Sequence, residues 1–161
     1  MAEISKADEL RLAQARKDSP YIRTPQEDGV DYPIPELEGA SRKILVDRDT
    51  MHSTMCTWGY SRFEPKTALH KKHAHPDCEE IMYILSGRGV GGMDETEALF
   101  CAGDTIFVPQ NVVHWFYNPF DEPVEMLWLY TKPSLREAGY SMESGGYQNV
   151  GEEIEKEVLF T

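Results

Sequence analysis

The chain has 161 residues, 40% of them hydrophobic, which suffices for one domain with a substantial core and is too short to suggest two. Its 28 acidic and 16 basic side chains give a net charge of −12. This acidity argues against binding to nucleic acid or to an anionic membrane, because the phosphate groups would be repelled. The three cysteines form no Cys-x-x-Cys pair and predict free thiols rather than a disulfide framework or a zinc knuckle.

The first forty residues are predicted to form a helix and an extended arm. Ser5 followed by Asp8 is a weak capping signal for a short peripheral helix over residues 5–17. Residues 18–38 contain four prolines and little periodicity, which predicts an extended arm that lies over the rest of the domain or over a neighbouring subunit. Charged residues follow Met1, so we expect neither a secretory signal nor a membrane span, and a cytoplasmic location.

Short strand-like segments separated by turns fill the middle of the chain. Alternating hydrophobicity predicts a strand over 42–46, a longer strand or a hairpin over 50–63, and a strongly apolar strand over 124–130. Trp58 and Tyr60 share a face of the second segment, and alternation alone does not say whether that face is a pocket wall or core. Many short strands with few helices predict an all-β, antiparallel sandwich or barrel.

Three regions are therefore expected along the chain. The helix and arm occupy residues 1–40, a β-barrel occupies 41–133, and a tail occupies 134–161. The tail loses strand character and ends in an acidic stretch over 152–157 that is predicted to form a helical turn or two.

Two histidines and a carboxylate are placed to meet at one point. His73 and His75 are two residues apart, so both side chains project to the same side of a strand. A carboxylate follows at Glu79 or Glu80, before an apolar run over 81–85. Imidazole and carboxylate ligands suit Fe, Mn, Co, Ni or Zn better than Ca or Mg, which prefer oxygen alone. The segment predicts a site for one divalent transition metal ion without choosing among these ions.

A second segment, residues 103–118, supplies a third histidine inside a predicted strand. Together the two segments resemble the paired motifs of the cupin superfamily. The first motif is His-x-His, three or four residues, Glu, six residues, Gly; the second is Gly, five residues, Pro-x-Gly, two residues, His, three residues, Asn. The matching positions are His73, His75, Glu80 and Gly87 in the first motif, and Gly103, Pro109, His114 and Asn118 in the second.

Two positions depart from the family pattern. Asn111 stands where the pattern has glycine in the turn before the third histidine, and Asn tolerates a positive φ better than other non-glycine residues, so we expect the turn to survive. Thr67 stands where glycine is expected six residues before His73, so the loop over 64–69 is expected to be remodelled.

The resemblance implies a double-stranded β-helix, the jelly-roll or cupin barrel, with one metal ion held by His73, His75, Glu80 and His114. Glu80 is preferred to Glu79 because it alone leaves six residues before Gly87. On a six-coordinate ion, four protein ligands leave about two positions for water, substrate or dioxygen.

The neighbours of these ligands predict an apolar pocket. The strand parity of the ligands places Met82, Ile84 and Phe116 on the interior wall. Five polar residues are candidates for proton transfer or substrate anchoring, although a surface or core-edge position is favoured for each: Tyr83, Glu79, Arg62, Arg88 and Tyr130. His52 and His70 are interpreted as ordinary surface or core residues, and His70 as pointing away from the ion if its strand has already begun.

The resemblance is compatible with several activities, because a fold does not choose a reaction. We favour a metal-dependent enzyme that acts on a small oxygenated organic acid or enolisable ketone chelated at the metal, most simply of the dioxygenase type. A non-redox isomerase, lyase or decarboxylase is the first alternative, and a small-molecule-binding or sensory module without turnover is the second. The resemblance also implies a homodimer, and we expect residues 18–38 to take part in it.

Overall fold

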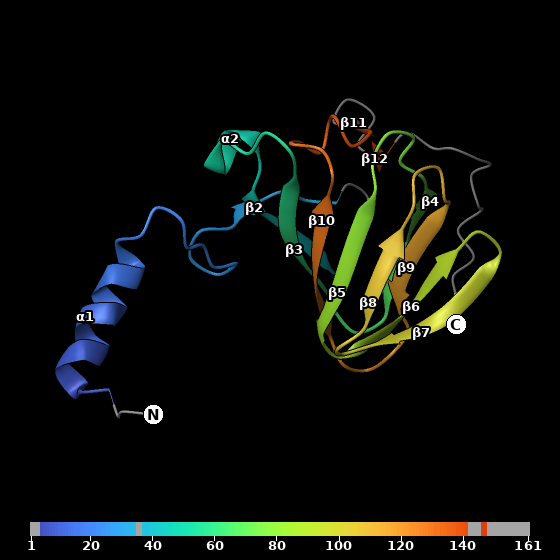
Figure 1. Cartoon of the computed structure of the whole chain (residues 1–161). Coiled ribbons are helices and arrows are strands. Elements are labelled where there is room, and N and C mark those ends of the chain that lie inside the picture. The colour runs from blue at the N-terminus through green and yellow to red at the C-terminus, as the bar shows by residue number, and fades with distance from the viewer. Residues whose placement is uncertain (1–3, 35–36, 142–145, 148–161) are drawn as a thin grey trace.

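The computed structural model describes residues 4–34, 37–141 and 146–147, and most of it is two antiparallel sheets that face each other (Figure 1). One sheet has six strands in the order β1-β2-β3-β10-β5-β8, and the other has four in the order β4-β9-β6-β7. The six strands are Val30–Asp31, Ala40–Val46, Thr57–Phe63, Val124–Tyr130, Glu80–Ser86 and Thr105–Val108, and the four are Thr67–His73, His114–Asn118, Arg88–Met93 and Thr96–Cys101. This arrangement confirms the predicted all-β jelly roll.

The core lies between the two sheets because alternate side chains of each strand point inward. In β5, Met82 and Ile84 are buried, whereas the intervening Tyr83 and Leu85 are exposed. The strand β10 repeats this pattern from Val124 to Tyr130. Since successive residues of a strand face opposite sides of the sheet, the period-2 pattern alone places these side chains correctly.

The outer side of the six-stranded sheet carries apolar side chains that face away from the core. Leu129 pairs with Trp58 on one side and with Ile81 on the other, and Ile81 pairs with Phe107. The face shared by Trp58 and Tyr60 is therefore this outer side, a point that alternation left open. We call the following residues the outer apolar face: Trp58, Ile81, Tyr83, Leu85, Phe107, Leu127 and Leu129.

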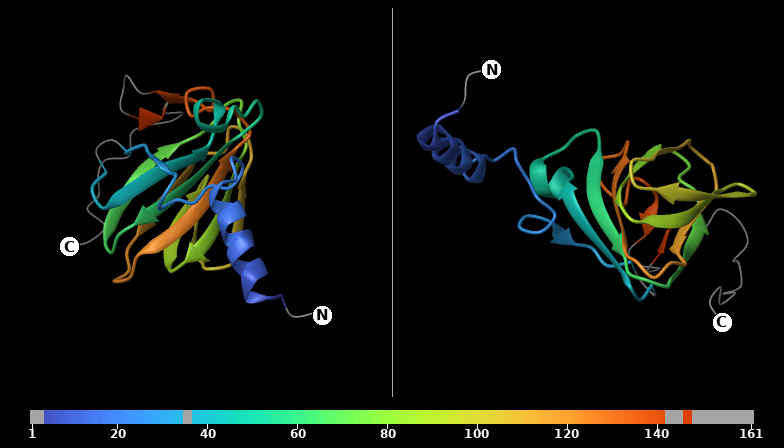
Figure 2. Two further views of the ribbon diagram at one scale, coloured as in Figure 1. Left: turned by 90° about the vertical axis from the view of Figure 1, so that its left-hand side faces the viewer. Right: turned by 90° about the horizontal axis from the view of Figure 1, so that it is seen from below.

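The N-terminal helix forms where the capping signal predicted it. The helix α1 spans Lys6–Lys17, and the Ser5 side chain accepts a hydrogen bond from the Asp8 amide. It buries none of its residues and stands clear of the barrel in Figure 1 and in the right-hand view of Figure 2. The arm that follows joins the sheet at β1, where Val30 and Asp31 pair with β2, and the Tyr32 amide next to it donates to the Arg42 carbonyl at 2.8 Å. Within the described ranges, no helix has the length and apolar character needed to cross a membrane.

The prediction of a long strand or hairpin over 50–63 was wrong in its first half. The short helix α2, Arg48–Met51, begins there, because the Asp47 side chain caps the Thr50 amide and the Thr50 side chain caps Asp47 in return. His52 then takes a left-handed conformation with φ 56° and ends the helix, so β3 starts only at Thr57. The alternating pattern over residues 50–63 predicted a strand and gave no indication of this cap.

The tail differs in part from its prediction. Leu135 and Ala138 are buried against the core, and a two-residue strand β11, Tyr140–Ser141, pairs with β12, Gly146–Tyr147. The tail therefore regains some strand pairing, which its composition did not indicate. The helical turn predicted over residues 152–157 lies outside the described residues.

A carboxylate on the outer side of the six-stranded sheet provides a stability prediction. Glu125 accepts hydrogen bonds from Tyr60 (2.6 Å), Ser86 (2.8 Å) and Arg62 (3.0 Å). The hydrogen bonds from Tyr60 and Ser86 are the main reasons why the pKa of Glu125 lies below its usual value. A depressed carboxyl pKa adds stability that is complete above the unfolded pKa, about 4.3 for Glu, and is lost as the pH falls through the folded value.

We expect Glu125→Gln to lower the free energy of unfolding by about 1–2 kcal/mol at pH 7, and the difference from the parent to shrink below about pH 4. Denaturant titrations at pH 7, 5 and 3 measure it. Glu122→Gln is the matched control, because the Arg88–Glu122 ion pair is exposed and worth little. A deficit that is the same at every pH would contradict the role of the Glu125 charge.

Candidate metal centre

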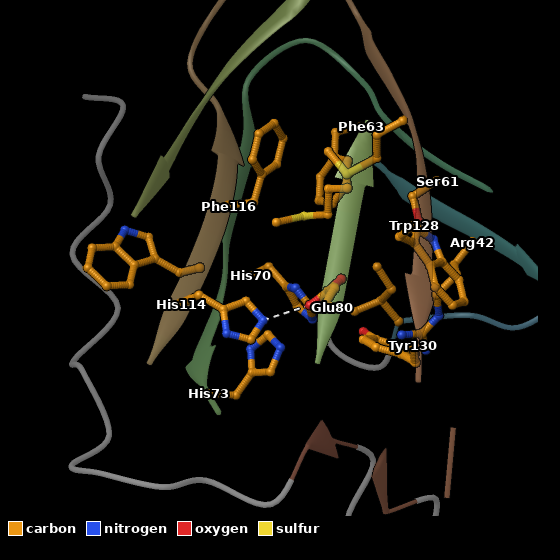
Figure 3. A pocket seen from close by; sticks show the side chains of 14 residues that line it. Arg42, Ser61, Phe63, His70, His73, Glu80, His114, Phe116, Trp128 and Tyr130 are labelled. Carbon is orange, nitrogen blue, oxygen red and sulfur yellow. Dashed lines mark hydrogen bonds and ion pairs between the residues drawn. The ribbon is translucent and has the colours of Figure 1, made fainter. Parts of the chain in front are cut away.

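Four buried side chains converge at one point: His73, His75, Glu80 and His114. Figure 3 shows three of them, His73, Glu80 and His114. His73 ends β4, Glu80 begins β5 and His114 begins β9, while His75 lies in the loop after β4. His73 and His114 are directly opposite in the β4–β9 pair. One potential ligand atom from each of the four residues lies within 4.8 Å of the others. Segments that are 34 residues apart at Glu80 and His114 therefore supply a single cluster.

Backbone carbonyl groups orient all three imidazoles in the same way. The Nδ1 atoms of His73, His75 and His114 lie 2.7, 2.6 and 3.0 Å from the carbonyl oxygens of Lys71, Ala138 and Val112. A carbonyl oxygen can only accept a hydrogen bond, so Nδ1 of each ring carries the proton. In His73 and His75 the Nε2 atom then carries the lone pair that a metal-binding histidine needs, whereas Nε2 of His114 faces the Glu80 carboxylate.

The charges of the cluster favour the ligand forms of two histidines and the carboxylate. Burial is the main influence that lowers the pKa of His73 and of His75, so both rings are neutral near pH 7. Burial raises the pKa of Glu80, but the hydrogen bond and charge of His114 outweigh it and leave this pKa below its usual value. Glu80 is therefore ionised near pH 7.

His114 and Glu80 share one proton between them. Their Nε2 and Oε2 atoms lie 2.9 Å apart. Burial lowers the pKa of His114, but the hydrogen bond and charge of Glu80 outweigh it and raise this pKa. A divalent cation can take the place of the shared proton, because it neutralises the same carboxylate and binds the same nitrogen lone pair. Three imidazole nitrogens and one carboxylate oxygen suit a divalent transition metal ion.

The turn before His114 shows why Asn replaces glycine at position 111. Asn111 has a φ of 64°, which is in the left-handed region as expected. Its amide donates to the His75 carbonyl at 3.0 Å, and its side-chain amide donates to the Pro76 carbonyl at 3.4 Å. The turn of the second motif is thus tied directly to the first motif. Thr67, the other departure, is buried and donates to the carbonyls of Gly39 and Glu64.

A pocket opens beside the cluster, with a cavity volume of about 40 Å³, enough for about three water molecules. Met82 and Phe116 lie in its wall, where strand parity placed them. Ile84, expected on the same wall, is fully buried in the core and is not among the residues that line this cavity. The residues lining it are Ile34, Arg42, Ser61, Phe63, His70, His73, Glu80, Met82, His114, Trp115, Phe116, Met126, Trp128 and Tyr130.

His70 does not point away from the cluster as predicted. It lines the pocket, and its ring centroid lies 5.0 Å from that of His73. The register of β4 against β9 shifts between Thr67 and His70 and again between His70 and His73. Such irregularities change which side of the sheet the following side chains face. The parity argument failed because it assumed a regular strand.

Of the five polar candidates, the structure brings one to the pocket. Tyr130 lines it, and its hydroxyl group helps to keep the pKa of Glu80 low. Arg62 lies on the outer side with Glu125 and Glu64, and Tyr83 is exposed there. The other two also lie away from the pocket: Arg88 pairs with Glu122, and the Glu79 amide bonds to Thr131.

Several pocket residues were not singled out from the sequence. Trp128 and Met126 share the inward parity of Tyr130 in β10, so the alternation of that strand contains the signal. Arg42 lies on β2 opposite Ser61, and both line the pocket. Nothing in the local sequence distinguishes Arg42 from a surface arginine.

Comparison with known proteins supports this description. Residues 59–130 match the family model described as "Cupin domain". A stretch of 62 residues is 40% identical to an uncharacterized protein of Methanocaldococcus jannaschii, covering 38% of this chain and 47% of that one. Another of 88 residues is 32% identical to an acireductone dioxygenase of Frankia alni, covering 52% and 42%. The chain thus spans less than half the length of these two relatives.

Solved structures give a consistent picture. A variant of Bacillus subtilis oxalate decarboxylase superposes with a TM-score of 0.55 at 25% identity, over 64% of this chain and 28% of that one. A predicted oxalate decarboxylase from Thermotoga maritima superposes with a TM-score of 0.57 over 69% of this chain and 98% of the other. At 22% identity, the similarity to the Thermotoga maritima protein shows only a shared fold.

Proposed function

We propose that this chain, which belongs to the cupin superfamily, is a metal-dependent enzyme that acts on a small oxygenated organic acid in the pocket beside His73, His75, Glu80 and His114. The observation that carries the proposal is the shared orientation of the three buried imidazoles: backbone carbonyls hold each Nδ1, so the three Nε2 atoms and the Glu80 carboxylate gather at one point. Four ligands leave open positions on a six-coordinate ion, so a substrate can bind next to it.

A bound divalent ion would polarise a carbonyl or carboxylate oxygen of the substrate and, if redox-active, would also supply dioxygen chemistry. The protein residues shape the place where this occurs. Met82, Phe63 and Phe116 form an apolar wall, which excludes bulk water and strengthens electrostatic interactions in the site. The Tyr130 hydroxyl group, which is hydrogen-bonded to Glu80, holds a proton at the edge of the pocket.

Within this class we favour a dioxygenase, in which both atoms of dioxygen enter the organic products as a carbon–carbon bond breaks. Histidine and carboxylate ligands with open positions are the ligand type of non-haem iron oxygenases. The similarity to an acireductone dioxygenase over 88 residues supports this choice. Of the two expected substrate types, the organic acid and the enolisable ketone, the enolisable ketone fits a dioxygenase more directly.

A decarboxylase is the second candidate, and a specific observation favours it. The solved structures that the barrel resembles include oxalate decarboxylase at 25% identity. In this non-oxygenase alternative, a carboxylate substrate loses carbon dioxide and no dioxygen is consumed. The pocket beside the cluster, with a cavity volume of about 40 Å³, is where such a small carboxylate would bind.

One experiment separates these candidates. The protein is loaded anaerobically with Fe²⁺ or with Mn²⁺, and oxygen uptake and carbon dioxide release are followed over small keto acids, diketones and dicarboxylates. Substrate-dependent oxygen uptake supports the dioxygenase. Carbon dioxide release without oxygen uptake supports the decarboxylase. Binding without turnover of any substrate would overturn the enzyme proposal in favour of a sensory or binding module.

We also propose a homodimer, built on the outer apolar face and the N-terminal arm. Leu85, Tyr83, Ile81 and Phe107 in this face are 38–51% exposed, and α1 buries no residue on its own barrel. Glu125 lies on the same side of the sheet as this face, and it is paired with Arg62 at 3.0 Å. Two such faces can therefore meet with little acidic repulsion, and we expect a second copy of the chain to cover the face.

Phe107→Glu is expected to shift the protein from dimer to monomer, because it places an unpaired charge in the proposed buried interface. Light scattering after size-exclusion chromatography measures the mass. Leu99→Glu is the matched control, since Leu99 is 52% exposed against 51% for Phe107 but lies on β7 of the other sheet. A parent protein that is monomeric, and unchanged when residues 18–38 are deleted, would contradict the dimer.

A further inference from the structure

A short segment after the last long strand of the barrel reaches back to the metal-ligating cluster. We call residues 132–139 the C-terminal strap; in Figure 1 it is the orange segment between β10 and β11. Its Ala138 carbonyl accepts the hydrogen bond from Nδ1 of His75 at 2.6 Å, and both residues are 1% exposed. The match to the cupin domain ends at residue 130, so the acceptor for this ligand comes from outside the matched region.

The strap contains a single turn with helix-type hydrogen bonding, which directs this carbonyl toward His75. The Ala138 amide donates to the Ser134 carbonyl at 3.0 Å. The Ser134 hydroxyl oxygen accepts a hydrogen bond from the Glu137 amide at 3.2 Å and so caps the start of the turn. Gly139 ends the turn with a φ of 98°, a left-handed value that favours glycine. These local contacts fix the direction of the Ala138 carbonyl.

Contacts with three other parts of the molecule anchor the strap. Leu135 is 4% exposed and belongs to the hydrophobic core between the sheets. The Lys132 carbonyl accepts from the hydroxyl group of Thr57, the first residue of β3, at 2.8 Å. The Pro133 carbonyl accepts from the amide of Arg48, the first residue of α2, at 2.8 Å. The orientation of His75 therefore depends on packing far from its own loop.

The chain from Thr131 onward also holds the loop that joins two of the ligands, His75 and Glu80. At the start of this loop, the ring of His75 is bound to Ala138. At its end, the Glu79 amide donates to the Thr131 hydroxyl oxygen at 2.9 Å, and the Thr131 amide donates to the Glu79 carbonyl at 3.1 Å. Both ends of the loop are thus fixed against one continuous stretch of chain.

We propose that the C-terminal strap is a positioning element for the metal centre, and that Leu135 is a positioning residue that acts through the Ala138 carbonyl and the His75 ring. A carbonyl acceptor at Nδ1 fixes the orientation of the ring and makes its Nε2 atom a stronger ligand. If the strap is displaced, the buried N–H group loses its acceptor or the ring turns away, and either change weakens metal binding. This inference rests on the ligand assignment of the proposed function and not on the reaction.

Calorimetric titration of the metal-free protein with Mn²⁺ tests the proposal. Leu135→Ala shortens the side chain that anchors the strap, and we expect the Mn²⁺ dissociation constant to rise about 10-fold, the lower end of the range for losing an outer-shell partner. Leu135→Met keeps the side-chain volume and should restore the affinity to within about threefold of the parent. Ile84→Ala is the matched control, because Ile84 is buried in the same core but lies on β5. It should lose stability and keep the parent affinity.

Proton NMR of the metal-free protein gives a second reading, on the His75 ring itself. The buried Nδ1–H group should give a resonance that is protected from exchange with water and is assigned by its absence from His75→Gln. We expect this resonance to remain in Leu135→Met and Ile84→Ala and to be lost to exchange in Leu135→Ala. A role of Leu135 in general stability alone would not separate these variants.

Two outcomes would overturn the proposal and leave the ligand assignment standing. One is the parent Mn²⁺ affinity in Leu135→Ala, and the other is an equal loss of affinity in Leu135→Ala and Ile84→Ala. A parent protein that bound no Mn²⁺ would refute the ligand assignment, and this proposal with it. If Leu135→Ala does not fold, Ser134→Ala carries the test, because it removes only the cap of the turn and should weaken Mn²⁺ binding about two- to tenfold.

Discussion

His114→Ala is expected to leave the protein almost free of metal. The substitution removes one of four ligands, and it also leaves the buried Glu80 carboxylate without its 2.9 Å hydrogen bond. Loss of an outer-shell partner alone typically costs about 10- to 100-fold in metal affinity, so loss of a ligand should cost at least the upper part of that range. Glu80→Gln should act in the same direction, since an amide lacks the charge that compensates the cation.

Metal content after loading and dialysis, measured by elemental analysis, checks this prediction for the parent and both variants. His52→Ala is a control for the loss of a surface histidine, because His52 is exposed at the end of α2. His70→Ala is the more informative control, since His70 lines the same pocket but is not in the four-residue cluster. Normal metal content in both His114→Ala and Glu80→Gln would refute the ligand assignment.

Ile84→Ala is expected to cost about 2–5 kcal/mol of unfolding free energy, the range for truncating a buried aliphatic side chain. Ile84 has no exposed surface and packs within the core between the sheets. The cavity left behind cannot close easily, because the strand is held by β10 on one side and β8 on the other. The deficit should appear in denaturant titrations of the metal-free protein.

Leu99→Ala is the control for this second prediction. Leu99 is also aliphatic and within a strand, but it is 52% exposed on β7, and its truncation should cost less than about 0.5–1 kcal/mol. Similar losses in the two variants would contradict the assigned side-chain parity. Metal content of Ile84→Ala should stay near that of the parent, because Ile84 does not line the pocket.

The sequence was informative wherever a local rule operates. Strand alternation placed Met82 and Ile84 on the inner side of β5, and Ser5 marked the start of α1. Predictions from the sequence failed where a short-range contact or a bulge interrupted the regular alternation of side chains along a strand. The cap between Asp47 and Thr50 produced a helix in a segment that alternates like a strand, and the register shifts in β4 turned His70 into the pocket.

By itself, the sequence indicated the antiparallel all-β architecture through strand periodicity, and its resemblance to the paired cupin motifs pointed to the four residues that the fold brings together. Only the tertiary structure decided what surrounds the cluster. Arg42 is drawn from β2, and its guanidinium group faces the pocket because β2 pairs with β3 and the arm carbonyls of Tyr32 and Pro33 hold it there. Contacts between segments so far apart in the chain leave no periodic signal, and so the place of Arg42 in the pocket wall appears only after folding.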